Sequence, residues 1–215
     1  MAQPTAETRA ERRRLRALRL ALPPAERVAA EAAILAALKR LRLFRRGRRV
    51  AVYLAMPGEV DLAGAMAVAF ESGTEIYVPQ LTSRRRGRMR FVRLRRDCRL
   101  RPNAAAFGIL EPAGGTRDSL PPAHLDAVLV PLVGFDRQGN RLGMGAGYYD
   151  RALHRLRDRD RAWRRPRLVG IAFGCQETGR IEPAPWDVAL DLIVTEKEIV
   201  VPRRSAAARQ QEDPA

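Results

Sequence analysis

The apolar residues of this chain fall into short runs, and the longest runs without a charged residue have nine members, as at 127–135. A helix needs about 20 apolar residues to span a bilayer, so no transmembrane segment is expected. Runs of this length suit strands that are buried on both faces, as in a parallel sheet covered by helices. Glu7 and Glu11 stand among the N-terminal arginines, so no signal peptide is expected either.

Strand-length and helix-length segments alternate along the chain. Two helices are expected in the first 46 residues, and further helices at 62–70 and 149–159. Strands are expected at 50–55, 75–79, 89–94, 127–132, 168–173 and 190–195, and an extended connection at 103–122. This order predicts an α/β fold in which residues 1–200 form a single three-layer domain with a mainly parallel sheet. Residues 201–215 lack an apolar period and are expected to be a disordered tail.

The two N-terminal helices carry distinct faces. The first has an apolar stripe formed by Leu15, Leu18 and Leu22, with Arg9, Arg12, Arg16 and Arg19 on another face. Pro23 and Pro24 end it, and the second helix is expected to turn Val28, Leu35 and Leu38 inward.

The formal net charge is +16, with 38 arginines against two lysines. Such a surplus favours anionic partners, so a basic nucleic-acid-binding protein is one alternative for this chain. The sequence lacks the alternation of aromatic and basic residues that binds RNA, and a general bias toward arginine explains the ratio equally well. The two cysteines, Cys98 and Cys175, are far apart, which predicts a reduced cytosolic protein without a zinc cluster.

One glycine-rich segment follows the buried strand expected at 127–132. Gly143, Gly145 and Gly147 stand at every second position, which lets backbone N–H groups turn toward an anion. The segment then enters an expected helix, whose first N–H groups would favour a phosphate. It is not a Walker A motif, because no Lys-Ser/Thr pair follows. A phosphate-binding loop and a flexible turn both remain open on spacing alone.

The wider segment carries a more specific pattern, in which Phe135-Asp136 is followed by Arg-Leu-Gly-Met-Gly-Ala-Gly-Tyr-Tyr-Asp at 141–150. It resembles the signature of the 5-formyltetrahydrofolate cyclo-ligase family. The resemblance extends to 53–61, to 107–112 and to the order of polar residues between Gln176 and Glu196, and covers about 12–196.

The resemblance implies a NagB/RpiA/CoA-transferase-like fold and an ATP- and Mg²⁺-dependent ligase. The implied reaction closes 5-formyltetrahydrofolate to 5,10-methenyltetrahydrofolate through a phosphorylated formyl group, and releases ADP and phosphate. The partners would be small molecules alone, namely ATP and the folate with its polyglutamylated forms, in a monomeric cytosolic enzyme without membrane or nucleic-acid contacts.

By resemblance, the site residues fall into four groups. Arg141 and Tyr148 would be catalytic. ATP would contact Arg12, Arg16, Arg141, Leu142, Gly143, Met144, Gly145, Ala146, Gly147, Tyr148 and Tyr149. Folate would contact Leu54, Glu59, Met144, Gly145, Ala146, Gly147 and Tyr148. Asp150 and Asp187 would bind Mg²⁺.

Plainer interpretations remain open for several residues. Arg12 and Arg16 could form a solvated basic face, and Glu59 could be the acid at the start of the next helix. Asp150 could likewise be a helix-start carboxylate, and Asp187 could form a local turn.

The sequence also departs from the family at two positions. The family has Lys where Arg12 stands, and many members have His where Trp186 stands. These departures leave open a divergent protein with lost or altered activity.

Ten arginines lie between Arg84 and Arg101. We expect this basic run to be the solvated face of a hairpin. Alternatively, it could attract a polyglutamylated folate through long-range attraction.

Overall fold

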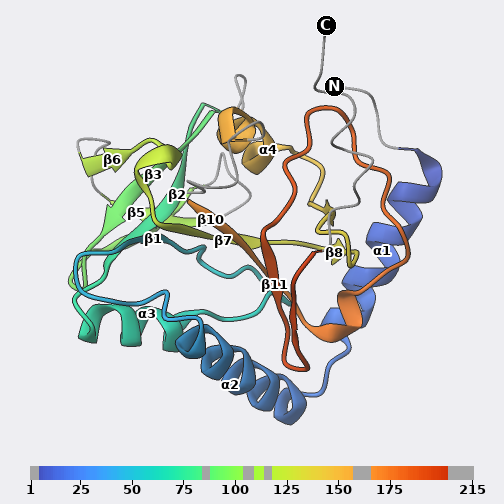
Figure 1. The fold of residues 1–215 in the computed structure, drawn as a ribbon, viewed down its shortest axis with the longest axis horizontal. Coiled ribbons are helices and arrows are strands. Elements are labelled where there is room, and N and C mark those ends of the chain that lie inside the picture. Colours follow the sequence, from blue (N-terminus) through green and yellow to red (C-terminus); the bar gives the residue numbers. More distant parts are fainter. Residues whose placement is uncertain (1–4, 84–87, 104–108, 114–117, 157–165, 203–215) are drawn as a thin grey trace, which may run out of the picture.

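The computed structural model describes residues 5–83, 88–103, 109–113, 118–156 and 166–202, and Figure 1 shows how they are arranged. The helices are α1 (Ala6–Leu20), α2 (Pro24–Arg40), α3 (Ala63–Glu71) and α4 (Tyr148–Leu153), with 3-10 turns η3 (Pro122–His124), η4 (His154–Leu156) and η6 (Gly174–Gln176). The strands are β1 (Arg49–Ala51), β2 (Glu75–Ser83), β3 (Arg88–Leu94), β4 (Leu100–Asn103), β5 (Ile109–Pro112), β6 (Ser119–Leu120), β7 (Ala127–Pro131), β8 (Gly134–Phe135), β9 (Arg141–Leu142), β10 (Arg167–Ile171), β11 (Leu192–Val194) and β12 (Ile199–Val200).

The main sheet has the order β12-β11-β10-β7-β1-β2-β3-β6. All pairings from β11 across to β2 are parallel, whereas β12, β3 and β6 join antiparallel at the margins. The expectation of a mainly parallel sheet is therefore confirmed. No helix among the described residues is long and apolar enough to cross a membrane.

Helices cover both faces of this sheet. Val50 and Val52 point to the face that α2 and α3 cover, where Leu38 is fully buried. Ala51 points to the opposite face, where α4 contributes Leu153 to a second core cluster. In Figure 1, α2 and α3 accordingly lie together on one side of the sheet and α4 on the other. Strands with apolar residues on both faces thus form the middle of three layers, as predicted.

Helix α1 lies at one end of the molecule and packs differently from the prediction. Leu15 is buried with Val133, Leu142 and Ile181 in a small third cluster. Leu18 is 41% exposed, so its place in the predicted stripe is wrong, while Leu22 is partly buried. Arg19, which was expected on the polar face, is only 2% exposed. Leu15 and Arg19 are four residues apart and share one helix face, so docking of Leu15 buries Arg19 as well.

In α2, the prediction holds for Leu35 and Leu38 and is wrong for Val28, which is 67% exposed. The fully buried residues of this helix begin at Ile34, whereas in its first half Ala30 is only partly buried against the core. Val28 follows the apolar spacing but lies on a part of the helix surface that is exposed.

The remaining differences concern element boundaries. The first strand is shorter than expected, and the predicted connection 103–122 contains β5 and β6, with β4 pairing antiparallel to β5. The helix expected at 149–159 is α4 followed by η4, and its remainder lies outside the described residues. The predicted tail also lies outside them from residue 203 onward.

Candidate active site

A cavity of about 450 Å³ opens beyond the carboxyl ends of β1 and β7. These two strands are neighbours in the sheet, but β1 continues through α3 to β2 on one side and β7 through α4 to β10 on the other. Chain connections that diverge in this way leave a crevice, and open α/β sheets bind their ligands there. The fold alone therefore locates a site next to the glycine-rich segment.

Most of the predicted site residues line this cavity. They are Arg16, Leu54, Glu59, Arg141, Gly143, Met144, Ala146, Gly147, Tyr148, Tyr149 and Asp150. Arg12, Leu142, Gly145 and Asp187 are not among its lining residues. The side chain of Leu142 instead packs with Leu15 beneath α1.

The glycine loop, which we define as residues 143–147, joins β9 to α4 in a conformation that needs glycine. Gly145 has φ +99° and Gly147 has φ +64°, a region that other residues rarely adopt. A Cβ placed on Gly145 would lie 3.9 Å from Nη1 of Arg12, so the loop passes close to α1. Arg151 of α4 holds the loop from the other end, because its Nη2 donates to the carbonyl of Ala146 at 2.6 Å.

Asp136 fixes the turn that leads into this loop. It is 1% exposed, and its carboxylate accepts hydrogen bonds of 2.9–3.0 Å from the backbone N–H groups of Gln138, Asn140 and Ile181. The side-chain amide of Asn140 donates to it as well. Asp136 of the Phe-Asp pair in the sequence pattern therefore has a structural role, since four donors already satisfy its carboxylate.

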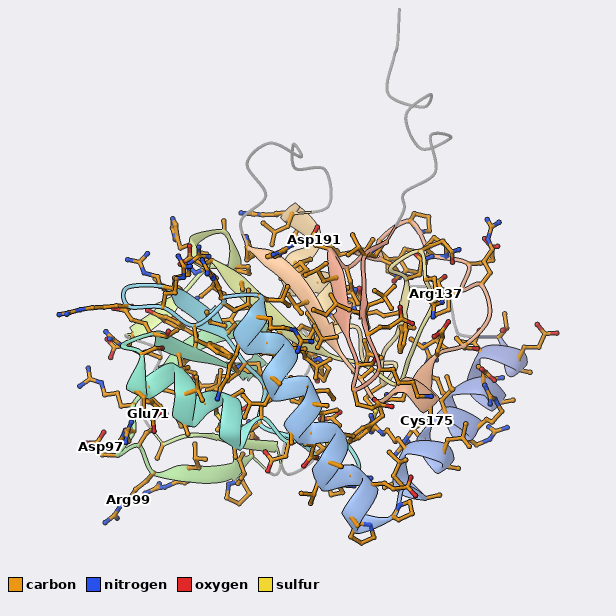
Figure 2. All side chains as sticks on the ribbon, turned by 60° about the horizontal axis from the view of Figure 1, so that its bottom comes forward. Glu71, Asp97, Arg99, Arg137, Cys175 and Asp191 are labelled. Carbon is orange, nitrogen blue, oxygen red and sulfur yellow. The ribbon has the colours of Figure 1, made fainter. Side chains whose placement is uncertain are left out.

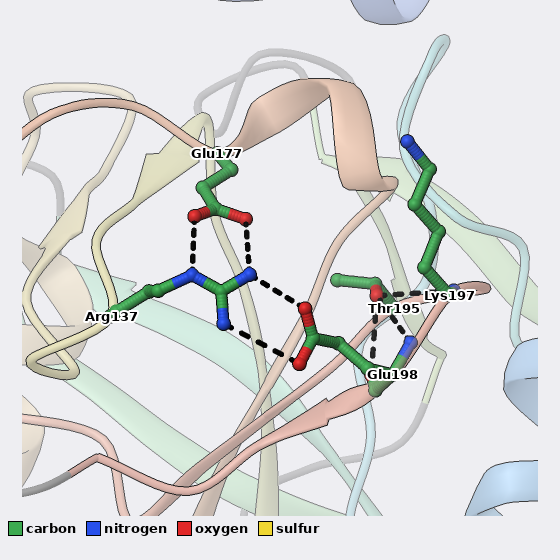
Figure 3. Close-up of polar contacts among 5 residues, drawn as sticks. All are labelled: Arg137, Glu177, Thr195, Lys197 and Glu198. Atoms are coloured by element: carbon green, nitrogen blue, oxygen red, sulfur yellow. Dashed lines mark hydrogen bonds and ion pairs between the residues drawn. The ribbon is translucent and has the colours of Figure 1, made fainter.

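The exposed side chain of Arg137 stabilises the same turn through contacts with two glutamates. Its guanidinium makes a two-point contact with Glu177 and also contacts Glu198, the latter at 2.6 Å (Figure 3). Glu198 in turn lies in a tight turn whose backbone N–H groups bond to Thr195. Three segments that are distant in sequence thereby meet at one exposed arginine.

Arg141 and the two aspartates form the polar end of the site. The buried Arg141 side chain donates to the carbonyl of Val188 and to the carboxylate of Asp150. Asp187 accepts from the backbone N–H of Ala184 at 2.9 Å, so the local turn left open for it is present. Burial raises the pKa of Asp187, the charge of Asp150 raises it further, and Arg141 and Arg12 oppose the shift. The charge of Asp150 therefore acts on Asp187 across this end of the site.

Two carboxylates are a sufficient protein contribution for Mg²⁺, which keeps several waters and is commonly shared with substrate phosphates. Among the described residues, no group of three or more His, Cys, Asp or Glu side chains is placed to bind a metal. Asp150 and Asp187 thus fit an ion that arrives with a nucleotide better than one enclosed by protein alone.

Arg12 belongs to this end as well. Its Nε is buried and lacks a hydrogen-bond partner within the described part of the chain, and desolvation lowers its pKa while Asp187 opposes the shift. Arg12 is therefore partly buried beside Asp187 rather than fully solvated. Arg16 is exposed and lines the cavity.

Glu59 stands at the opposite wall, where its side chain is 8% exposed. The backbone N–H of Met56 donates to it at 3.0 Å, and Nη1 of the buried Arg19 lies 3.9 Å from its Oε1. Burial raises the pKa of Glu59, and the Met56 N–H, Arg19 and Arg16 oppose that shift. Glu59 does not cap the following helix, because Asp61 accepts from the backbone N–H of Ala63.

Several lining residues were not predicted as site residues. Tyr53 lines the cavity while its hydroxyl donates to the carbonyl of Val60 at 3.0 Å. Glu111, 7% exposed, lines it too and accepts from the backbone N–H of Leu81 at 3.0 Å. The others are Met56, Pro79, Leu81, Met89, Pro131 and Leu132. Tyr53 and Glu111 lie in segments that carry the family resemblance, and this resemblance was the sequence signal that could have identified them as site residues. Trp186 does not line the cavity.

The basic run is partly described and lies on the surface. Its arginines at 90, 93, 95, 96, 99 and 101 are exposed, while residues 84–87 lie outside the described part. Arg93 pairs with Glu75 at 3.3 Å and Arg95 with Asp118 at 3.2 Å. Figure 2 shows Arg99 and Asp97 projecting at one end of the molecule, away from α1.

Comparisons with known proteins identify the family to which this chain is similar. The profile of the 5-formyltetrahydrofolate cyclo-ligase family matches residues 4–196. The 5-formyltetrahydrofolate cyclo-ligase of Haemophilus influenzae is 32% identical over 151 residues, or 70% of this chain and 77% of that protein. The Escherichia coli K12 enzyme of the same name is 34% identical over 152 residues, with 70% and 79% covered. The solved structure of Aquifex aeolicus 5,10-methenyltetrahydrofolate synthetase superposes with a TM-score of 0.75 at 31% identity, covering 92% of this chain and 94% of that one.

Proposed function

Because the chain belongs to the 5-formyltetrahydrofolate cyclo-ligase family, we propose that its cavity closes 5-formyltetrahydrofolate to 5,10-methenyltetrahydrofolate at the expense of ATP. The family makes the chain a ligase of folate one-carbon metabolism. The observation that carries the proposal is that one cavity joins the glycine loop, Arg141 and Asp150 to the buried carboxylate of Glu59. A triphosphate and a pterin could thus be held against each other.

The reaction has two bond-forming steps. The formyl oxygen attacks the γ-phosphorus, the new O–P bond forms, the bond to the bridging oxygen breaks, and ADP leaves. N10 then attacks the formyl carbon and loses its proton, the C–O bond to phosphate breaks, and phosphate leaves. The methenyl bridge between N5 and N10 remains.

At the phosphate end, charge is the main requirement. The backbone N–H groups of the glycine loop would hold phosphate oxygens. The positive charges of Arg12, Arg16 and Arg141 would stabilise the negative charge that develops on the leaving ADP. Tyr148 and Tyr149 would flank the reacting groups, and Leu142 would contribute only its backbone. Mg²⁺, held by Asp150 and Asp187, would neutralise phosphate charge.

At the pterin end, a carboxylate and an apolar wall are required. Glu59 would accept the N–H groups of the aminopyrimidine, with Leu54 and the residues of the glycine loop beside the ring. The apolar side chains of Leu81 and Met89 support exclusion of water. Exclusion matters because a phosphorylated formyl group would otherwise hydrolyse before N10 reacts.

Several expectations about the whole protein are part of the same proposal. Residues 1–200 act as one catalytic domain, the enzyme is a cytosolic monomer, and its partners are small molecules. The exposed arginines between Arg84 and Arg101 attract the tail of polyglutamylated folate.

The test mixes the purified protein with Mg-ATP and 5-formyltetrahydrofolate and follows the near-ultraviolet absorbance of the methenyl product. Product formation that stops when ATP is omitted, and in Asp150→Ala, would support the proposal. A wild-type protein that binds ATP but forms no product would be a divergent member with altered activity. Salt-sensitive binding of nucleic acid without any response to ATP would instead favour the nucleic-acid alternative.

A further inference from the structure

We propose that Arg19 is a positioning residue for folate, which holds the carboxylate of Glu59 in the orientation that receives the pterin. The inference rests on the proposed function, because it gives Glu59 a substrate. Arg19 itself does not line the cavity, so it acts through Glu59.

Arg19 contacts two residues that line the cavity, although it does not line the cavity itself. Its Nη1 donates to the carbonyl of Leu132 at 3.2 Å and lies 3.9 Å from Oε1 of Glu59. Leu132 and Glu59 both line the cavity, and they follow the two central strands β7 and β1. One guanidinium therefore bridges the ends of these strands, and its charge faces the carboxylate that the Met56 N–H also holds.

The surroundings leave Arg19 little freedom. Its side chain is 3% exposed, and its backbone carbonyl accepts from Nη2 of Arg27 at 2.5 Å. The turn before Glu59 packs directly onto the end of α1, because a Cβ on Gly58 would lie 2.7 Å from Cδ2 of Leu20. Gly58 also has φ +83°, a backbone conformation that favours glycine.

The arrangement is poor as a purely structural device. Within the described chain, the buried Nε of Arg19 lacks a hydrogen-bond partner, and a buried charge that is incompletely bonded costs stability. A well-packed apolar pair would often be at least as stable at such a position. A charged pair that faces a ligand cavity is better explained by what its carboxylate does for the ligand.

Arg19 also favours the ionised form of Glu59, against the burial that raises the pKa of this carboxyl and alongside the Met56 N–H. The groups that act on Glu59 are Arg19 and Arg16 of α1 and the Met56 N–H, with Tyr53 and Tyr149 interacting from the strand and α4 sides. Arg16 is exposed in the cavity and free to turn toward a ligand, whereas Arg19 is buried and stays beside Glu59. The ionised carboxylate accepts two pterin N–H groups, and a protonated one would place an O–H donor against them.

The test compares Arg19→Met and Arg19→Lys with the matched control Arg13→Met, which removes an exposed arginine from the same helix. We expect Arg19→Met to raise the KM for 5-formyltetrahydrofolate by roughly tenfold or more, and the KM for ATP by less than about threefold. Without Arg19, the pKa of Glu59 should rise further, so the acidic limb of kcat/KM for folate should move to higher pH. Arg19→Lys keeps the charge and should return that limb toward the wild-type position, and Arg13→Met should resemble the wild type throughout.

A double variant keeps the inference testable if Arg19→Met folds poorly. Combining it with Glu59→Gln removes both buried charges, and the combined variant should bind folate no more weakly than Glu59→Gln alone. Additive losses, equal changes in both KM values, or an unmoved acidic limb in folded Arg19→Met would overturn the inference while the enzyme remained a cyclo-ligase. A wild-type protein that makes no methenyl product would overturn the proposed function itself, and this inference with it.

Discussion

The two aspartates differ in how their side chains are held. Asp150 is bound by Arg141, whereas the hydrogen bond described for Asp187 comes from a backbone N–H of its own turn. Replacement of Asp150 therefore removes a proposed metal ligand and leaves Arg141 buried without its ion pair. Replacement of Asp187 removes a proposed ligand and a charge that acts on Arg12 and Arg141, but no ion pair within the described residues. The two positions should accordingly give different kinetic signatures.

We predict that Asp150→Asn lowers kcat by roughly a hundredfold or more, as expected for loss of charge stabilisation in a transition state. Asp187→Asn should keep more of kcat and raise the Mg²⁺ concentration at half-maximal rate. Initial rates across a Mg²⁺ titration check both, with Asp97→Asn, an exposed aspartate at the far end (Figure 2), as the control. An unchanged Mg²⁺ requirement in Asp187→Asn would exclude it as a ligand.

Glu11 gives a prediction about stability and pH. Hydrogen bonds from Arg14 and Thr178 lower the pKa of Glu11 to about 2 from an ordinary value of 4.5. A carboxyl whose pKa is lower in the folded state stabilises the fold above its unfolded pKa, and this contribution disappears as the pH falls from 4.5 toward 2. Glu11→Gln should therefore unfold more easily at pH 7, by at most about 1 kcal/mol for so accessible a pair. The urea midpoints should approach each other as the pH falls from about 5 toward 2, and a difference that stays constant over this range would contradict the assignment.

At the scale of elements, the three glycines of the glycine loop differ in whether their backbone conformation requires glycine. Gly145 and Gly147 have positive φ, so any replacement there strains the backbone. Gly143 does not, and a Cβ built on it would meet no protein atom within 4 Å. Within the described residues, neither a left-handed backbone nor close packing requires glycine at position 143, and the space beside it is open to a ligand.

We predict that Gly143→Ala leaves the melting temperature within about 1 °C of the wild type, because it adds neither strain nor a clash. Its KM for ATP should rise about fivefold or more if phosphate oxygens approach the backbone there. Gly147→Ala serves as the comparison and should lower the melting temperature, because its φ is left-handed. An unchanged KM in Gly143→Ala would make the loop a turn rather than a phosphate cradle.

The elements also mark where sequence reasoning succeeds. Short runs that are apolar on both faces identified the central strands and hence the three layers, as for β7. Apolar periodicity could not tell which helix face would contact the core, so Leu18 was misassigned while Arg19 was buried, and Val28 was misassigned on the exposed part of α2. The contiguous loop at the site was predicted, whereas Glu111 was not, because β5 brings it to Leu81 from 30 residues away. Arg19 was missed because its partners, Glu59 and Leu132, come from distant turns.

For the molecule as a whole, the net charge of +16 need not imply nucleic acid. The exposed arginines of the basic run lie outside the cavity, yet two of them are close to its wall. Arg90 follows the lining residue Met89, and Arg101 pairs in register with Glu111. Charge at these places can draw in an anionic tail without touching the reacting groups.

We predict that reversing Arg90 and Arg101 to Glu raises the KM for polyglutamylated 5-formyltetrahydrofolate more than the KM for the monoglutamate. The difference should shrink as salt is added, since exposed charges more than about 10 Å apart are screened at 0.1 M. Steady-state kinetics at two salt concentrations measure it. Equal effects on both substrates would remove the steering role.

The proposed site draws on the helix at 6–20, the turn at 53–59, the loop at 143–147 and the aspartate at 187, which lies outside the cavity lining. During translation these pieces leave the ribosome in that order, and Gln176, which donates to the carbonyls of Leu132 and Val133, follows the loop. A nascent chain therefore carries its glycines before the second aspartate exists. The proposed ATP site is complete only once residue 187 has been added, so chains that stop before it should not consume ATP.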